Sequence, residues 1–276
     1  MAAGHDSSPP SRFASLACDS SPLAARGYAS GSSRRSRGEA PLASRAAAMR
    51  DDGGPAVSAD LTHVDTWMFD LDNTLYPLET GLAVDISERI TRYVERLTAL
   101  PRDEARALQK HYLDQHGLTL KGLMLHHGVD PNEFHAMFAD VSLEALARDP
   151  ALIAAIARLP GRRLIFTNAD AGHTDRVMSR LGLGELFDAV FHIESAGFVP
   201  KPDPVAFERL LAAHAVAPRS TAFFEDRALN LEPAHALGMT TVLVGAGAEA
   251  NTDPFVRHRA PRLAAFLEAA KVRETV

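Results

Sequence analysis

The stretch FDLDNTLYP, residues 69–77, decides how the rest of the sequence is interpreted. It begins at the end of the apolar run Trp67-Met68-Phe69, and its acidic residues Asp70 and Asp72 come where that run stops. A short apolar run that ends in acidic residues predicts a buried strand with polar chemistry at its carboxyl end. Ligands bind outside the carboxyl ends of the strands in an open parallel sheet. We therefore expect polar residues at the ends of the other strands as well.

The sequence after Pro160 alternates between short apolar runs and longer amphipathic stretches. The runs predict strands over residues 163–166, 189–193, 221–224 and, as the last strand, 240–244. The stretches predict helices over residues 173–181, 204–213, 231–237 and 262–270. Strands that alternate with helices of this length predict an α/β fold with a mostly parallel sheet that is covered on both faces.

Residues 78–160 follow a different pattern, because apolar residues such as Ile86, Ile90 and Val94 recur there at helical spacing. We therefore predict an all-helical domain over residues 78–160, inserted into an α/β core that consists of residues 61–77 and 161–276. The pair His126-His127 before Gly128 is expected to end one of the inserted helices, since cations and glycine are favoured at helix C-termini.

The first sixty residues are predicted to be a disordered tail. Residues 1–50 are rich in Arg, Ser and Ala and poor in acidic residues. Such a composition buries too little apolar surface to offset the entropy that the chain loses on folding. Two other interpretations stay open. An organellar transit peptide has a similar composition, and translation that begins at Met49 would leave residues 1–48 out of the protein.

The composition of the chain excludes several classes of protein. No apolar run in the 276 residues approaches the roughly 20 residues of a membrane helix. Cys18 is the only cysteine, which excludes a disulfide framework. The formal net charge of −6 disfavours binding to nucleic acid or to anionic membranes. We therefore expect a cytoplasmic protein, a monomer or homodimer, with no nucleic acid or membrane as its partner.

Polar residues follow the other predicted strands too. Thr167 and Asn168 follow the second strand, Lys201 lies beyond the third, and the pair Glu225-Asp226 follows the fourth. Each of these has an ordinary alternative as a turn, helix-cap or loop residue. Their recurrence at successive strand ends, after a D-x-D-x-T motif, favours one shared site.

The residue types in this set predict phosphoryl chemistry. Carboxylates from Asp70, Asp72 and Asp226 in one crevice repel one another unless a cation binds, and oxygen ligands favour Mg²⁺. Lys201 and the hydroxyl of Thr167 are suited to the oxygens of a small phosphorylated metabolite. A carboxylate can attack phosphorus and form an acyl phosphate. Asp72 can protonate the leaving alkoxide and later take a proton from water.

The stretches that carry these residues resemble the motifs of the haloacid dehalogenase-like superfamily, over residues 64 to about 245. Within the superfamily they are most similar to the pyrimidine 5′-nucleotidase family in FDLDNTLYP, LTLKGLMLHHGVDP, TNADAGHTDRV and ESAGFVPKPDP. The resemblance implies a Rossmann-like core with an inserted helical cap. It also implies Mg²⁺ dependence and hydrolysis of nucleoside monophosphates such as UMP and CMP.

The resemblance also implies a role for each residue. Asp70 would be the nucleophile and Asp72 the general acid and base. Phosphate would be bound by Thr167 and Asn168, and Lys201 would offset negative charge on the nucleophile and the phosphoryl group. The expected ligands of Mg²⁺ are Asp70, Asp226 and the backbone carbonyl of Asp72.

The sequence departs from the family pattern at two places. Arg227 follows the acidic pair where many relatives have a small hydroxyl residue, which bears on the surroundings of the metal site. Residues 138–140 lack a histidine that is often found at that point of the cap. This second departure bears on the substrate, because specificity in the superfamily resides largely in the cap.

Three other functions stay open. Haloacid dehalogenation needs a nucleophilic carboxylate but no metal, so the presence of Asp72 and Asp226 disfavours it. A receiver-like module, which accepts a phosphoryl group without being an enzyme, lacks an insert like residues 78–160. Phosphatases or phosphotransferases that act on sugar phosphates share every motif and differ in how well the cap excludes water.

Two further sets of residues are interpreted as structural. His173 opens a helix near the motifs and is expected at the surface rather than at the substrate. Five aromatic residues could stack on a base, but their spacing is typical of a helical core: Tyr76, Tyr93, Tyr112, Phe134 and Phe138.

Overall fold

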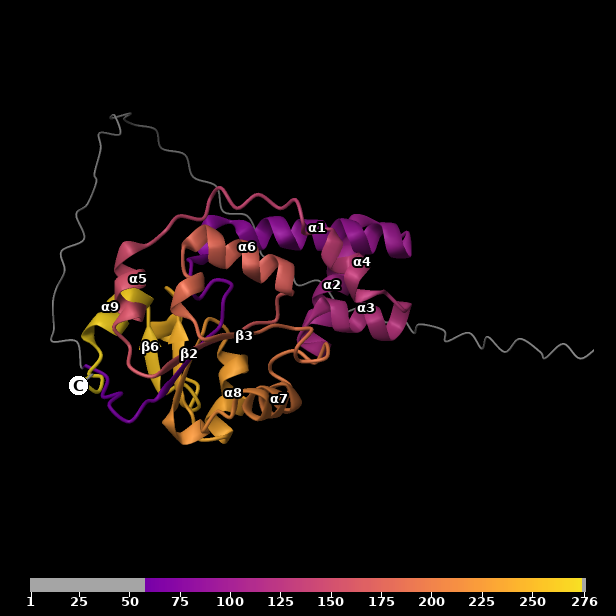
Figure 1. Cartoon of the computed structure of the whole chain (residues 1–276). Coiled ribbons are helices and arrows are strands. Elements are labelled where there is room, and N and C mark those ends of the chain that lie inside the picture. Colours follow the sequence, from indigo (N-terminus) through magenta and orange to yellow (C-terminus); the bar gives the residue numbers. More distant parts are fainter. Residues whose placement is uncertain (1–57, 275–276) are drawn as a thin grey trace, which may run out of the picture. The chain divides into compact units, whose positions relative to one another are not determined.

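The centre of the fold is a six-stranded, all-parallel sheet in the order β3-β2-β1-β4-β5-β6 (Figure 1). The structure is a computed structural model that describes residues 58–274. Its strands are β1 (Thr66–Phe69), β2 (Arg162–Phe166), β3 (Ala189–Phe191), β4 (Thr221–Glu225), β5 (Thr240–Val244) and β6 (His258–Ala260). The α/β fold class with a Rossmann-like parallel sheet, predicted from the alternating pattern, is confirmed.

The first strand lies in the middle of the sheet because both of its edges are paired. Thr66 aligns with Arg162 of β2 on one side and with Thr221 of β4 on the other. All four residues of β1 are buried. Its side chains alternate between two hydrophobic cores, one on each face of the sheet, with Trp67 in the first and Met68 in the second. Burial on both faces explains why the run is apolar throughout.

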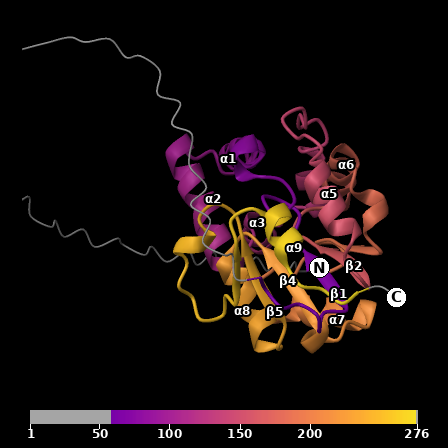
Figure 2. The same ribbon diagram turned by 90° about the vertical axis from the view of Figure 1, so that its left-hand side faces the viewer.

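Helices cover both faces of the sheet. One core is completed by residues of α5 (Pro150–Ala157), α6 (Ala171–Leu181) and α9 (Leu263–Ala269), and the other by residues of α7 (Pro204–His214) and α8 (Ala228–Ala236). Figure 2 shows these two groups of helices on opposite sides of the strands. Short 3-10 helices are η1 (Leu78–Thr80), η2 (Gly184–Leu186), η3 (Pro218–Ser220) and η4 (Ala248–Ala250).

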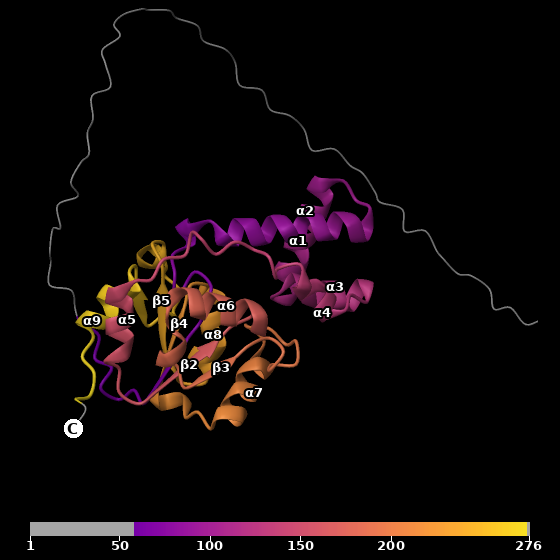
Figure 3. The ribbon, with the colours of Figure 1, turned by 45° about the horizontal axis from the view of Figure 1, so that its top comes forward.

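Four helices between β1 and β2 form the inserted helical cap, and we call them the cap helices. They are α1 (Leu82–Thr98), α2 (Arg102–His116), α3 (Thr119–His127) and α4 (Pro131–Ala136). Each packs against the next along the chain, and Figure 3 shows them grouped at one end of the sheet. As predicted, α3 ends at His127 before a left-handed Gly128.

The structure differs from the sequence-based expectation at the edge of the sheet. Residues 240–244 were predicted as the last strand, which is wrong, because β6 pairs with β5 beyond it. This strand has three residues, of which His258 and Arg259 are partly exposed and only Ala260 is buried. No apolar run signals it. In addition α5, which lies within the stretch 78–160, packs against α9.

Most of the predicted tail, residues 1–57, lies outside the described residues. The last part of it, residues 58–60, joins the core, since the Lys271 N–H donates to the Ala59 carbonyl at 2.9 Å and the Leu61 N–H donates to the Lys271 carbonyl at 2.8 Å. Within residues 58–274, none of the helices combines the length and the hydrophobicity needed to span a membrane.

Candidate active site

Loops at the carboxyl ends of the central strands meet at one place. Asp70 follows β1 and Thr167 follows β2, and their backbone N–H groups continue the sheet by donating to the Phe224 carbonyl (2.9 Å) and the Phe191 carbonyl (3.0 Å). Glu225 is the last residue of β4. All three side chains are buried. Because parallel strands end on the same side of a sheet, residues distant in sequence come together here.

Lys201 links three of these loops. Its side chain is 1% exposed, and Nζ donates hydrogen bonds of 2.7 Å to Asp70 Oδ1, to Glu225 Oε2 and to the Phe166 carbonyl. Burial opposes the charge of the ammonium group, but Asp70 and Glu225 outweigh this effect and raise the pKa of Lys201 above its ordinary value. The predicted proximity of Lys201 to Asp70 is therefore present. The contact of Glu225 with this lysine is not predicted from the sequence.

Asn168 holds the backbone of Lys201 in place. Its amide Nδ2 donates to the Lys201 carbonyl at 3.1 Å, and its Oδ1 accepts from the Lys201 N–H at 2.8 Å. The hydroxyl oxygen of the neighbouring Thr167 accepts from the Ala169 N–H at 3.0 Å. Phosphate binding by Thr167 and Asn168 stays a prediction. The two hydrogen bonds between Asn168 and Lys201 give the Asn168 side chain a second role, which is to hold the lysine loop in place.

Asp72 lies beside two other polar side chains. Its Oδ1 is 2.9 Å from His173 Nε2 and accepts a hydrogen bond of 2.5 Å from the Tyr76 hydroxyl. Burial alone would raise the pKa of Asp72, but the hydrogen bond and charge of His173, followed by the hydrogen bond from Tyr76, hold that pKa below its ordinary value. For His173, burial is the largest single effect and lowers the pKa, yet the hydrogen bond and charge of Asp72 together raise it.

The expected surface position of His173 is wrong, since the residue is 5% exposed. Asp170 is the N-cap of α6, and its Oδ1 accepts from the His173 N–H at 2.9 Å. This cap starts the helix so that the first turn carries the imidazole to Asp72. The sequence Asp-Ala-Gly-His at residues 170–173 is a recognisable signal for a helix N-cap. The direction of the His173 imidazole, however, is set by the turn between β2 and α6.

Three carboxylates converge next to Lys201. Asp70, Glu225 and Asp226 each offer an oxygen, and these atoms lie within 4.8 Å of one another. Burial, followed by the charge of Glu225, raises the pKa of both Asp70 and Asp226 above the ordinary value. A bound cation would keep these groups ionised at neutral pH. The donors are all oxygen, so the residues fit Mg²⁺.

All six predicted site residues line one cavity of about 310 Å³: Asp70, Asp72, Thr167, Asn168, Lys201 and Asp226. The cap helices and the turn after α4 complete it with Ile86, Ser87, Ile90, Gln109, Leu120, Phe134 and Phe138. A larger cavity of about 1070 Å³ shares Asp226 but contains neither the lysine nor Asp70. The smaller cavity is therefore the candidate active site.

Two aromatic residues of the cap have the core position that the sequence predicts, and stacking on a base stays a prediction. Phe134 and Phe138 are buried in the hydrophobic core, as expected, with ring centroids 5.5 Å apart, and both also line the cavity. Tyr76 is buried as well, but its hydroxyl is committed to Asp72.

The chain is similar to several known proteins. A family model for hydrolases, described as haloacid dehalogenase-like hydrolase, matches residues 64–238. Phosphate metabolism protein 8 of Saccharomyces cerevisiae is 28% identical in an alignment of 193 residues, which covers 64% of this chain and 60% of the yeast protein. The chain thus spans less than two thirds of the length of that relative.

A solved structure shares the fold. The crystal structure of a HAD phosphatase from Thermococcus onnurineus aligns with a TM-score of 0.50 and 18% identity, over 74% of this chain and 97% of that one. L-2-haloacid dehalogenase from Xanthobacter autotrophicus aligns with a TM-score of 0.47 and 16% identity, over 74% and 97% of the two chains.

Proposed function

The chain belongs to the haloacid dehalogenase-like hydrolase family, and we propose that it is a Mg²⁺-dependent phosphatase, most specifically a pyrimidine 5′-nucleotidase. One observation carries the proposal: a buried lysine holds the Asp70 carboxylate at 2.7 Å in a cavity that Asp72 also lines. An oriented carboxylate beside a second carboxyl group is what a phosphoryl transfer through an aspartyl phosphate requires.

Asp70 acts as the nucleophile in the proposed reaction. One of its oxygens attacks phosphorus, the bond from phosphorus to the ester oxygen breaks, and an aspartyl phosphate forms. Water then attacks the same phosphorus, which breaks the acyl-phosphate bond, regenerates the carboxylate and releases inorganic phosphate. Lys201 fixes the orientation of Asp70 and supplies positive charge to the phosphoryl oxygens.

Asp72 moves the proton in both steps. It protonates the departing ester oxygen and later takes a proton from the attacking water. His173 Nε2 contacts the same carboxyl group at 2.9 Å, so a proton can be exchanged between the two side chains as the reaction proceeds. Thr167 and Asn168 follow β2 and line the same cavity, where we expect them to bind the phosphate.

Asp70, Asp226 and the backbone carbonyl of Asp72 would hold Mg²⁺. The ion would neutralise charge on the phosphoryl oxygens when bound. Glu225 remains the partner of Lys201 in this scheme.

The cap side of the cavity supports a nucleoside as the leaving group. Phe134 and Phe138 offer apolar, aromatic surface, and Gln109 and Ser87, which are hydrogen-bonded to each other at 3.1 Å, add polar groups among them. A flat base with polar edges matches such a surface, because ligand sites combine apolar walls with a few placed polar groups.

The substrate assignment is tested by phosphate release from UMP, CMP, AMP and glucose 6-phosphate in the presence of Mg²⁺. We expect the highest kcat/KM for UMP and CMP, and complete loss of activity on chelation with recovery when Mg²⁺ is restored. The Asp70→Asn variant is the control for contaminating phosphatases. Preference for the sugar phosphate would contradict the nucleotidase assignment and leave the phosphatase assignment intact, whereas release of phosphate from none of these compounds would contradict both.

A further inference from the structure

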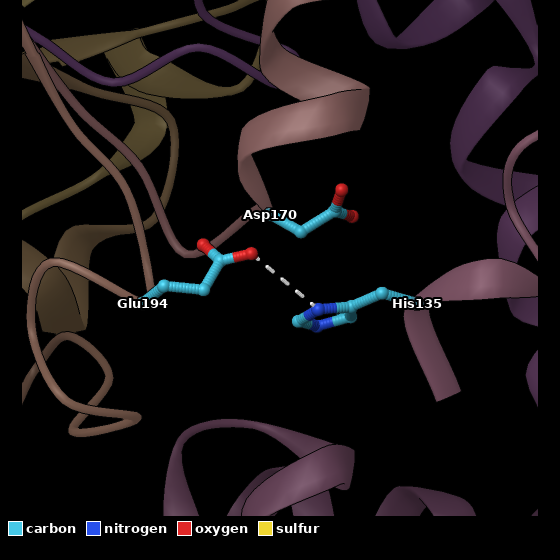
Figure 4. Close-up of side chains that lie close together, drawn as sticks. All are labelled: His135, Asp170 and Glu194. Atoms are coloured by element: carbon cyan, nitrogen blue, oxygen red, sulfur yellow. Dashed lines mark ion pairs between the residues drawn. The ribbon is translucent and has the colours of Figure 1, made fainter. Parts of the chain in front are cut away.

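A second group of metal-ligand side chains lies where the cap meets the core. His135 belongs to α4 of the cap, Asp170 precedes α6, and Glu194 lies in the loop after β3. Each offers one donor atom, and the three atoms lie within 4.8 Å of one another. Figure 4 shows the carboxylate of Glu194 extended toward the imidazole of His135, with Asp170 beside them. These residues are separate from Asp70, Glu225 and Asp226.

Backbone N–H groups at the start of α6 contact both carboxylates of this group. Asp170 Oδ1 accepts from the His173 N–H at 2.9 Å, and Glu194 Oε1 accepts from the Ala171 N–H at 3.3 Å. The other oxygen of Glu194 lies 2.7 Å from His192 Nδ1 but is buried without a hydrogen-bond partner among the described residues. Hydrogen bonds to metal-binding carboxylates, such as the two from these backbone N–H groups, fix the orientation of the carboxylates before an ion arrives.

The three donors converge without forming a hydrogen bond to one another. His135 Nδ1 is 3.6 Å from Glu194 Oε1, which is longer than a hydrogen bond. An imidazole binds a metal through an unprotonated nitrogen. The two carboxylates beside His135 carry negative charge that a cation would offset.

We propose that His135, Asp170 and Glu194 bind a Zn²⁺ ion that bridges the cap and the core. An imidazole nitrogen with two carboxylates suits Zn²⁺, whereas Mg²⁺ prefers oxygen ligands only. Tetrahedral Zn²⁺ with bonds of about 2.0–2.2 Å places its ligand atoms ~3.3 Å apart. The three donor atoms lie within 4.8 Å of one another, so binding of the ion would draw them closer together.

The position of the site gives the ion two consequences. It ties α4 to the start of α6 and to the loop after β3, so binding stabilises the cap against the core. His135 and Asp170 also line the candidate active-site cavity, so the ion adds positive charge at its rim. With three protein ligands, a fourth position stays open to water or to a substrate group.

The test is a calorimetric titration of the untagged protein with Zn²⁺. The buffer contains excess Mg²⁺, so that sites with only oxygen ligands are already occupied. We expect one Zn²⁺ per chain in the wild type and affinity at least tenfold weaker in His135→Gln and Glu194→Gln. The matched controls are His126→Gln and Glu144→Gln, two exposed positions of the same cap stretch that should bind as the wild type does. Equal affinity in the wild type and the ligand variants, or displacement of Zn²⁺ by Mg²⁺, would overturn the site.

Two further readouts keep a folding defect from being mistaken for lost binding. Circular dichroism and the thermal midpoint, both measured in EDTA, show whether each variant has the native fold. The conclusion is drawn from the ligand variants that have it. Zn²⁺ should raise the midpoint of the wild type and of the controls, because an ion that binds only the native state stabilises it. A change in the visible spectrum of bound Co²⁺ on His135→Gln should identify imidazole as a ligand, and an unchanged spectrum contradicts the proposal.

Discussion

Lys201 is a charged side chain that the interior holds only because it has partners. Its ammonium group is surrounded by Asp70, Glu225 and a backbone carbonyl, each at 2.7 Å. Charges buried in this way lose hydration and are retained when hydrogen bonds and opposite charge replace it. The lysine thereby holds the nucleophile in one orientation, which favours attack on a phosphoryl group bound in the cavity.

Asp72 is the residue that the proposed mechanism uses for proton transfer. Asp72→Asn keeps the shape of the side chain and its contact with Tyr76 but cannot exchange a proton. We expect kcat to fall by roughly 10²–10⁴, the usual contribution of a general acid. Steady-state kinetics with UMP measures this loss. A decrease of less than about tenfold would mean that another group transfers the proton.

His173 couples this site to pH. Its pKa is raised above the ordinary 6.5, so the ion pair with Asp72 stabilises the fold fully below pH 6.5 and loses that effect as the pH rises through the folded value. The pKa of Asp72 is lowered from 3.8, so its contribution is present above pH 3.8 and lost on further acidification.

His173→Gln should therefore separate the charge from the hydrogen bond. The variant can still donate to Asp72 but carries no titratable proton. We expect the difference in thermal midpoint between wild type and variant to be largest between pH 4 and 6.5 and to shrink at alkaline pH. Midpoints that differ by the same amount at every pH would show that the pair carries no net charge interaction.

At the scale of elements, the turn between α2 and α3 packs closely against the loop that carries Lys201. Gly117 has a φ of +74°, and a Cβ at this position would lie 2.9 Å from the Lys201 carbonyl. Gly128, at the end of α3, has a similar φ of +65° but open space around the same position. Substitution of either glycine by alanine therefore strains the backbone, but only the substitution at Gly117 also creates a steric clash with the Lys201 carbonyl.

Gly117→Ala should disturb the active site, and Gly128→Ala should not. Both variants are expected to lose about 1–2 kcal/mol of stability from the left-handed backbone. Only Gly117→Ala should also reduce kcat/KM, by ~10–100-fold, because it displaces the loop that carries Lys201. Unfolding by urea and steady-state kinetics measure the two effects. Equal kcat/KM in the two variants would show that the cap does not position this loop.

The elements that the sequence predicts best are those whose signal is local. The strands β1, β2, β4 and β5 contain short apolar runs, and α6 and α7 begin directly after Asp170 and Asp203, whose side chains cap them. The strand β6 is not predicted from the sequence, because an edge strand of three residues needs no apolar run. The direction of the His173 side chain is not predicted either, because it depends on the turn between β2 and α6 and not on the spacing of apolar residues.

At the scale of the whole molecule, insertion of the cap helices between β1 and β2 brings apolar side chains to the strand ends. The six predicted residues come from positions 70 to 226 and line one cavity, which follows from the rule that parallel strands end on one side. The pairing of Glu225 with Lys201 was not predictable, because adjacent acidic residues at a strand end do not reveal which one faces the lysine. The cap contacts that form the cavity are long-range packing with no local signal.

The covalent intermediate on Asp70 is the central claim, and acid quenching during turnover tests it most directly. The protein is mixed with ³²P-labelled UMP and Mg²⁺, quenched within one turnover and digested. We predict labelled phosphate on the peptide that contains Asp70, released by hydroxylamine as expected for an acyl phosphate, and no label in Asp70→Asn. Rapid hydrolysis of UMP without any labelled peptide, or appreciable turnover by the Asp70→Asn variant, would contradict the account.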